Sequence, residues 1–304
     1  MHLLLSIFAD DIVPIFAIAG IGFLLARHFD ASVKTVSKLS FNALSPCLVF
    51  DQLVTSHITG SEFGRMALFC VLLTAAMGLA AWLAAIPLRL DRQTFSSFLL
   101  VVMFSNSGNY ALPVVLFAFG RDALGYASVY FVTSATLVYT VGVLVAASGR
   151  RSVRRALMGV ARVPAIYAVV AAGVMMLTRA TVPLAVMRPI SMLSDAALPI
   201  MLLVMGMQLE RAVRPTHPTA VAVAVGLSLL VGPIVGVGLS SLLGFSGPAR
   251  QAAILLASMP AAVVTTVLAL EFDLDPSFAT STVFVSTMLS PFSLVLIIAY
   301  LQGF

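Results

Sequence analysis

The sequence predicts an all-α membrane protein, and three observations support this fold class. The chain has 304 residues, of which 61% are hydrophobic and only 10% charged, and its mean hydropathy is +1.09. A soluble domain is nearer about 45–50% apolar and about 25% charged. The apolar residues also gather in stretches long enough to cross a bilayer, which takes roughly 20 residues. No linker exceeds about a dozen residues, which leaves no room for a soluble domain.

Ten such stretches are predicted as transmembrane helices. Their approximate limits are 11–28, 33–56, 64–88, 94–119, 122–147, 161–180, 185–209, 217–244, 249–270 and 277–301. The first lacks a basic segment before it and a small-residue cleavage site after it, so it is predicted to be a span rather than a signal peptide.

The distribution of basic residues predicts the orientation. If the N-terminus lies outside, the inside loops hold 12 of the 17 basic residues and the outside loops hold 5. Cytoplasmic loops are enriched in lysine and arginine, so both termini are expected outside, in a cell (inner) membrane. The arginine-rich segment 148–160 is then the central cytoplasmic loop. We interpret its charge as a topology signal rather than as a lipid or partner site.

The central loop divides the chain into two halves, 11–147 and 161–301, of five spans each. An odd number of spans inverts the second half relative to the first, an arrangement found in many secondary transporters. Four features recur in the same order at offsets of 147 to 153 residues. The matched residues are Pro14 with Pro164, Pro46 with Pro199, Pro113 with Pro260, and Phe131-Val-Thr-Ser134 with Phe284-Val-Ser-Thr287.

Two spans carry signals for a helix break near the middle of the bilayer. The fourth reads Phe104-Ser-Asn-Ser-Gly-Asn-Tyr-Ala-Leu-Pro113, and the ninth contains Ala257-Ser-Met-Pro260. Proline removes a backbone donor and disfavours helix in the preceding residue. Breaks are therefore expected around 108–113 and 258–261. Irregular backbone at this depth is tolerated only where it lines a cavity or is buried in protein. Each break should leave free N–H groups at a half-helix N-terminus, which suit an anion.

Polar residues near the breaks are the candidate binding residues. The asparagines of the chain are Asn42, Asn106 and Asn109, and all three lie in apolar segments. Asn106 and Asn109 are predicted to bind substrate, with a structural amide as the alternative. The other substrate-site candidates are Asn42, Tyr110, Pro113, Ser258 and Pro260. Tyr110 sits at the break and is interpreted mainly as a packing residue. The hydroxyl candidates for ion or proton coupling are Ser105, Thr133, Ser134, Ser286 and Thr287, and the other hydroxyl candidates are Ser258, Thr265 and Thr266. The alternative for each is a bond to a carbonyl of its own helix.

Acidic residues inside spans are functional candidates by default. Asp195 lies four residues before Pro199, as Asn42 lies four residues before Pro46. Asp195 is therefore a candidate for proton or cation coupling, and the alternative is that it caps the start of its span. Asp51 is predicted to be interfacial. The acids from Glu271 to Asp275 are predicted to lie in a solvated loop.

The chemistry-bearing motifs of soluble enzymes are absent from the sequence, so an enzyme is not expected. Cys47 and Cys70 lack metal-ligand spacing and are interpreted as small hydrophobic residues. No cofactor, metal or nucleic-acid partner is indicated. Gly20 and Gly22 lie within a span, where small residues allow close helix packing.

Several segments resemble the auxin efflux carrier family, which includes plant PIN carriers and bacterial malonate or malate permease-like proteins. The matching segments are Leu44-Ser-Pro-Cys-Leu-Val-Phe50, Gly108-Asn-Tyr-Ala-Leu-Pro113, Leu198-Pro-Ile-Met-Leu-Leu-Val-Met-Gly-Met-Gln-Leu209 and Met259-Pro-Ala-Ala-Val263. The resemblance covers nearly the whole chain. It implies ten helices in two inverted repeats, with spans 1, 2, 6 and 7 as a scaffold and spans 3–5 and 8–10 as a transport domain. Two broken helices would cross at the midplane with Pro113 and Pro260 at the crossing.

The resemblance further implies a carrier that moves a small organic anion, such as a carboxylate or an auxin-like acid, by an elevator-type motion. The expected partners are that anion and the lipid bilayer, with a homodimer as the candidate assembly. One alternative is a sodium-coupled symporter of larger amphipathic anions, similar to bile-acid carriers. Related sodium-coupled carriers place an acid beside the second break, whereas Ser258 and Met259 precede Pro260 here. A second alternative is a membrane receptor that binds without transporting.

Overall fold

The computed structural model describes residues 2–29, 31–56, 58–147, 163–178, 180–210 and 217–303. Within these ranges the chain is helical apart from short connections and one isolated β-bridge. The α-helices are α1 (His2–Ile7), α2 (Val13–His28), α3 (Val33–Leu39), α4 (Ser45–Thr55), α5 (Gly60–Ala85), α6 (Arg92–Met103), α7 (Ala111–Leu137), α8 (Val143–Ala146), α10 (Pro164–Thr178), α11 (Leu184–Leu209), α12 (Pro218–Gly226), α13 (Gly232–Leu242), α14 (Gly247–Ala257), α15 (Val264–Glu271) and α16 (Pro276–Leu301). The π-helical turns η1 (Phe8–Ile12), η2 (Ser40–Leu44), η3 (Val138–Gly142) and η4 (Leu227–Val231) join successive helices. The all-α prediction is confirmed for the described residues.

Six stretches of the described chain are long and apolar enough to cross a membrane. They are Leu3–His28, Gly60–Ala85, Ala111–Ala146, Leu184–Leu209, Pro218–Leu242 and Pro276–Leu301. The other predicted spans fall on helices separated by non-helical segments or on the short α10, and the helical stretch from α3 through η2 to α4 is not apolar enough to be counted. A multi-pass membrane protein is supported, whereas the ten-span inverted repeat stays a prediction. The predicted central loop at 148–160 lies outside the described residues.

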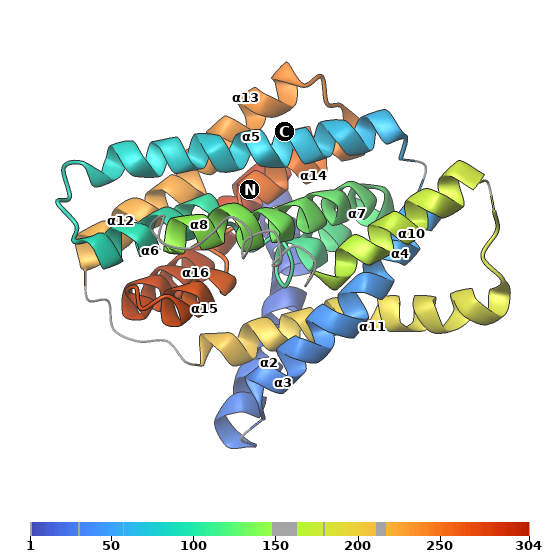
Figure 1. Ribbon diagram of the computed structural model, residues 1–304, viewed down its shortest axis with the longest axis horizontal. Helices are drawn as coiled ribbons and strands as arrows, with labels where there is room; N and C mark the ends of the chain where they lie inside the picture. Colours follow the sequence, from blue (N-terminus) through green and yellow to red (C-terminus); the bar gives the residue numbers. More distant parts are fainter. Residues whose placement is uncertain are drawn as a thin grey trace.

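The helices form two packed groups. The α11 group contains α2, α3, α4, α10 and α11, in which α11 packs on α2, α3 and α4, and α10 packs on α4. The α7 group contains α5 to α8 and α12 to α16, in which α7 packs on α5 and α14, and α16 packs on α6, α12 and α15. Figure 1 shows α5 along one edge, α11 with α2 and α3 along the opposite edge, and α7 between them. The groups meet where α7 contacts α4 and α11, and where α1 and η1 contact α16.

Helices α2 and α11 approach each other through their backbones. A methyl group added at Gly206 would overlap the carbonyl of Ala19, and one added at Gly22 would overlap the carbonyl of Leu203. Small residues at such crossings let two backbones approach closely. The interpretation of Gly22 as a packing residue is therefore confirmed. Gly20 differs, because an added methyl there would meet no atom within 4 Å.

The start of α6 is attached to the loop between α15 and α16. Asp91 caps α6 by accepting hydrogen bonds from the Thr94 hydroxyl and from backbone N–H groups, which lowers the pKa of its carboxyl. The Gln93 side chain donates to the Asp273 carbonyl (2.9 Å), and the Asp275 N–H donates to the Ser97 hydroxyl (3.0 Å). Asp275 also caps α16. Asp275 therefore lies in the predicted loop but is only partly exposed, because its carboxylate caps the start of α16, which packs against α6.

Candidate functional site

Two non-helical segments interrupt the α7 group at the positions of the proline-containing motifs. The first lies at 104–110, between α6 and α7, and the second at 258–263, between α14 and α15. The first segment begins at residue 104, four residues before the expected limit of 108. It also ends earlier than expected, because helix resumes at Ala111 and Pro113 lies in the first turn of that helix. Proline is tolerated in a first turn, where its missing N–H has no helical partner.

The two segments pair with each other as a short antiparallel β-bridge between Ser105 and Ala261. The Asn106 N–H donates to the Pro260 carbonyl (2.8 Å), and the Ala262 N–H donates to the Phe104 carbonyl (2.9 Å). Backbone groups that leave a helix inside an apolar protein must find other partners. The pairing provides these partners and fixes two distant parts of the sequence against each other.

Two serine hydroxyls secure this pairing. The Ser105 hydroxyl donates to the Leu256 carbonyl at the end of α14 (3.3 Å). The Ser286 hydroxyl of α16 accepts the Ala261 N–H (3.2 Å) and donates to the Val283 carbonyl of its own helix (3.1 Å). Both residues were predicted for ion or proton coupling, and the structure adds a backbone-bonding role for each.

The half-helix N-termini offer fewer free N–H groups than expected. The Ala111 N–H donates to the Asn106 carbonyl (3.1 Å), and the Leu112 N–H donates to the Gly108 carbonyl (3.3 Å). At α15 the Thr265 and Thr266 N–H groups donate to the carbonyls three residues earlier. The expectation of free N–H groups is therefore wrong at these positions, because the tight turns before each helix use them.

The side-chain amides of Asn106 and Asn109 have no hydrogen-bond partner among the described residues. Asn106 is only 6% exposed and Asn109 is half-buried. Neither amide is among the fully enclosed side-chain groups without a partner, so both keep some contact with solvent and are available to donate to a bound molecule. Gly108 stands between them, and a methyl group there would crowd the Phe131 ring (2.8 Å).

Most of the other predicted site residues have structural partners. The hydroxyls of Thr133, Ser258 and Thr265 bond to carbonyls of their own chain three or four residues earlier, at 2.9, 2.7 and 2.6 Å. Tyr110 is fully buried, with its hydroxyl 3.1 Å from that of Ser290, so it packs as expected. Ser134 and Thr287 are buried within α7 and α16 respectively.

Asn42 lies in η2, outside both paired segments, and its exposed side chain donates to the Lys38 carbonyl (2.8 Å). This bond gives the amide a local structural use. Among the described residues, no hydrogen bond joins the Asn42 side chain to the paired segments.

Asp51, which is predicted to be interfacial, is buried within the protein between α4 and α11. Only 5% of the residue is exposed, and its two carboxylate oxygens accept the hydroxyls of Ser191 and Ser194 on α11, each at 2.9 Å. The two serines are three residues apart and so share one face of α11. The spacing of the serines was visible in the sequence, but nothing there identified α4 as their partner.

Replacing Asp51 with alanine is expected to loosen α4 from α11. Hydrogen bonds between membrane helices contribute about 0.6–1.7 kcal/mol each, so losing two should lower the free energy of unfolding by about 1–3 kcal/mol. Thermal unfolding of the purified protein measures this, with Asp51→Asn as the matched control because an amide retains one acceptor. Equal melting temperatures for wild type and Asp51→Ala would contradict the assignment.

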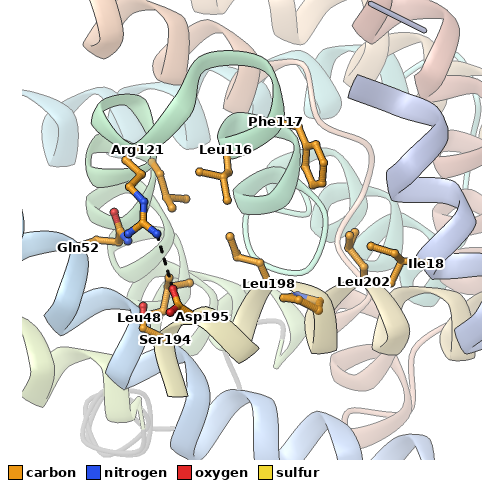
Figure 2. A pocket seen from close by; sticks show the side chains of 12 residues that line it. Ile18, Leu48, Gln52, Leu116, Phe117, Arg121, Ser194, Asp195, Leu198 and Leu202 are labelled. Carbon is orange, nitrogen blue, oxygen red and sulfur yellow. Dashed lines mark ion pairs between the residues drawn. The ribbon is translucent and has the colours of Figure 1, made fainter. Parts of the chain in front are cut away.

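A cavity of about 190 Å³ lies where the two helix groups meet, lined by α2, α4, α7 and α11 (Figure 2). Its lining residues are Ile18, Leu48, Gln52, Leu116, Phe117, Arg121, Leu124, Ser194, Asp195, Leu198, Pro199 and Leu202. Arg121 of α7 and Asp195 of α11 form an ion pair across it, with Nη2 and Oδ1 3.7 Å apart.

The structure rules out a capping role for Asp195 and places Arg121 at a break in its helix. Asp195 lies well inside α11, which starts at Leu184, so it does not cap that helix. Arg121 follows Gly120, whose φ of 79° interrupts the helical geometry within α7, so it lies where the spans 94–119 and 122–147 are predicted to connect. No motif in the sequence marks Arg121 as a functional residue, because a single arginine after a glycine is common between spans.

Comparisons with known proteins agree with the geometry. A family model described as "Membrane transport protein" matches residues 7–298. An "Uncharacterized transporter" of Methanothermobacter thermautotrophicus is 31% identical over 275 residues, which is 88% of each chain. The chain therefore belongs to the membrane transport protein family, the auxin efflux carrier family that its motifs resemble.

Proposed function

We propose that the protein is a secondary carrier for a small organic anion, and that the anion binds at the paired segments 104–110 and 258–263. The observation that carries the proposal is the pair of amides, Asn106 and Asn109, that have no partner among the described residues. Their N–H₂ groups can donate to a carboxylate. The positive end of the helix that begins at Ala111 is directed at the same segment, which favours negative charge there.

The charge of the paired segments favours an anion over a cation. Neither segment contains an aspartate or a glutamate, the ligands that a buried Na⁺ or Ca²⁺ would need for charge balance. The proposal therefore favours the carboxylate carrier over the sodium-coupled symporter.

Of the coupling residues predicted from the sequence, Asp195 is the proposed proton carrier, with Ser105, Thr133, Ser134, Ser286 and Thr287 as supporting polar groups.

An elevator-type motion is the proposed mechanism. The α11 group contains the elements expected for the scaffold (spans 1, 2, 6 and 7), and the α7 group contains those expected for the transport domain. The paired segments lie wholly within the α7 group. A rigid movement of this group along α4 and α11 would carry a bound anion without breaking the pairing. On this proposal α6 and the start of α7 form one broken span, and α14 and α15 form the other. The chain then forms ten spans in two inverted repeats with both termini outside.

Uptake into proteoliposomes tests the function. Purified protein is reconstituted, and the entry of labelled mono- and dicarboxylates is compared with that in protein-free liposomes, with and without sodium and a pH gradient. At least one carboxylate should enter faster with the protein and without sodium. If no carboxylate moves but one binds, the receptor alternative gains support. If flux requires sodium, the symporter alternative gains support.

A further inference from the structure

The cavity between the two helix groups contains a cation that is only weakly engaged. The Arg121 and Asp195 side chains are 71% and 69% exposed, and a single N–O approach of 3.7 Å joins them. Exposed ion pairs of this kind contribute little to stability because water screens both charges. The guanidinium can therefore exchange Asp195 for another carboxylate at small cost.

The remainder of the lining suits the body of an apolar molecule. Apart from the ion pair, the polar lining residues are Gln52 and Ser194, and the other eight are apolar, with Phe117 and Leu116 on one wall and Leu198 and Leu202 on another (Figure 2). Binding pockets of this type hold a ligand by apolar area and orient it with a few polar groups.

The polar groups select a carboxylate. The Ser194 hydroxyl already donates to Asp51 (2.9 Å). The Gln52 amide, by contrast, makes no hydrogen bond to any described residue, and Figure 2 shows it beside Arg121. Arginine can bind a carboxylate through two parallel hydrogen bonds, and Gln52 supplies a further neutral donor. The cavity therefore offers donors and one positive charge at one end.

We infer that this cavity is an entry site for a monocarboxylate with an apolar body, in which Arg121 binds the carboxylate and Asp195 is the competitor that the ligand displaces. The inference rests on the proposed carrier function and assigns a second, earlier binding step to it. Because Arg121 belongs to the α7 group and Asp195 to the α11 group, arrival of the ligand also removes an ion pair that connects the two groups.

Equilibrium binding of labelled phenylacetate to the purified full-length protein tests the inference. Asp195→Asn should tighten binding by about threefold or more, because the competitor loses its charge, and Arg121→Gln should weaken it by about tenfold or more. Arg65→Gln is the matched control. It removes a positive charge on the same predicted membrane face, outside the cavity, and should change the affinity by less than about twofold. Phenylacetamide, which lacks the charge, should not compete.

Three results would overturn the inference. They are an Arg121→Gln affinity equal to that of wild type, an Asp195→Asn affinity no higher than that of wild type, and the absence of phenylacetate binding in both wild type and Asp195→Asn. Melting temperatures identify a variant that fails to fold, and Asp195→Asn keeps the test decisive because it predicts a gain. The carrier proposal fails separately, if no carboxylate crosses the liposome membrane, so the two failures are distinguishable.

Discussion

Replacing Gly206 with alanine is expected to prevent the protein from accumulating in a folded form. The added methyl would overlap the carbonyl of Ala19 on α2, which is backbone and cannot rotate away. Overpacking of this kind costs about 1–3 kcal/mol or more, and here it separates the two helices that form the largest contact of the α11 group. Size-exclusion chromatography of the detergent-extracted protein should show loss of the monodisperse peak, and any remaining protein should melt at lower temperature.

Gly20→Ala is the matched control for this prediction. Gly20 lies on the same helix as Gly22, but a methyl group there meets nothing within 4 Å, and alanine has the higher helix propensity. This variant should fold as well as wild type. A Gly206→Ala protein with the yield and melting temperature of Gly20→Ala would show that α2 and α11 do not pack as described.

Replacing Asn109 with alanine is expected to reduce carboxylate uptake severely. The lost amide would otherwise donate to a charged ligand in a buried setting, where such a hydrogen bond contributes about 1.5–3 kcal/mol, or about 10–100-fold in kcat/KM. Asn106→Ala should act in the same direction, and the double variant should be inactive. Initial rates of labelled uptake at several concentrations measure both parameters.

Ser128→Ala is the control for the asparagine variants. Its hydroxyl is buried in α7 and donates to the Leu124 carbonyl of its own helix (2.9 Å), so uptake should remain near the wild-type rate. Unchanged uptake by the Asn106 and Asn109 variants, in protein that melts normally, would remove these residues from the binding site.

The sequence predicted the helical elements well, because their apolar runs are long and their ends carry proline, glycine or capping residues. The second interruption, at 258–263, begins where the motif indicates and ends two residues later than expected. The first begins at Phe104 rather than at Gly108, since Pro113 is compatible with a first helical turn and only the preceding polar residues disrupt the helix. The local pattern therefore located an interruption but did not fix its limits.

The contacts that single residues make with distant parts of the chain could not be predicted from the sequence. Asp51 looked interfacial because it lies near the end of an apolar run, and only the packing of α4 against α11 brings the two serines to it. Arg121 lies at the break after Gly120, where two apolar runs meet, but the cavity it faces is built from four helices that are distant in sequence. The bond between Asn106 and Pro260 joins segments about 150 residues apart, which no local pattern specifies.

Movement of the α7 group relative to the α11 group is the central claim, and cross-linking during transport tests it most directly. Cys47 and Cys70 are replaced by alanine, and cysteines are placed at Leu124 of α7 and Leu198 of α11, which line the same cavity. Bifunctional methanethiosulfonates of increasing length then connect them, with each single-cysteine protein as a control. Cross-linking should stop uptake of the transported carboxylate, and reduction should restore it. Undiminished uptake by fully cross-linked protein would contradict the movement.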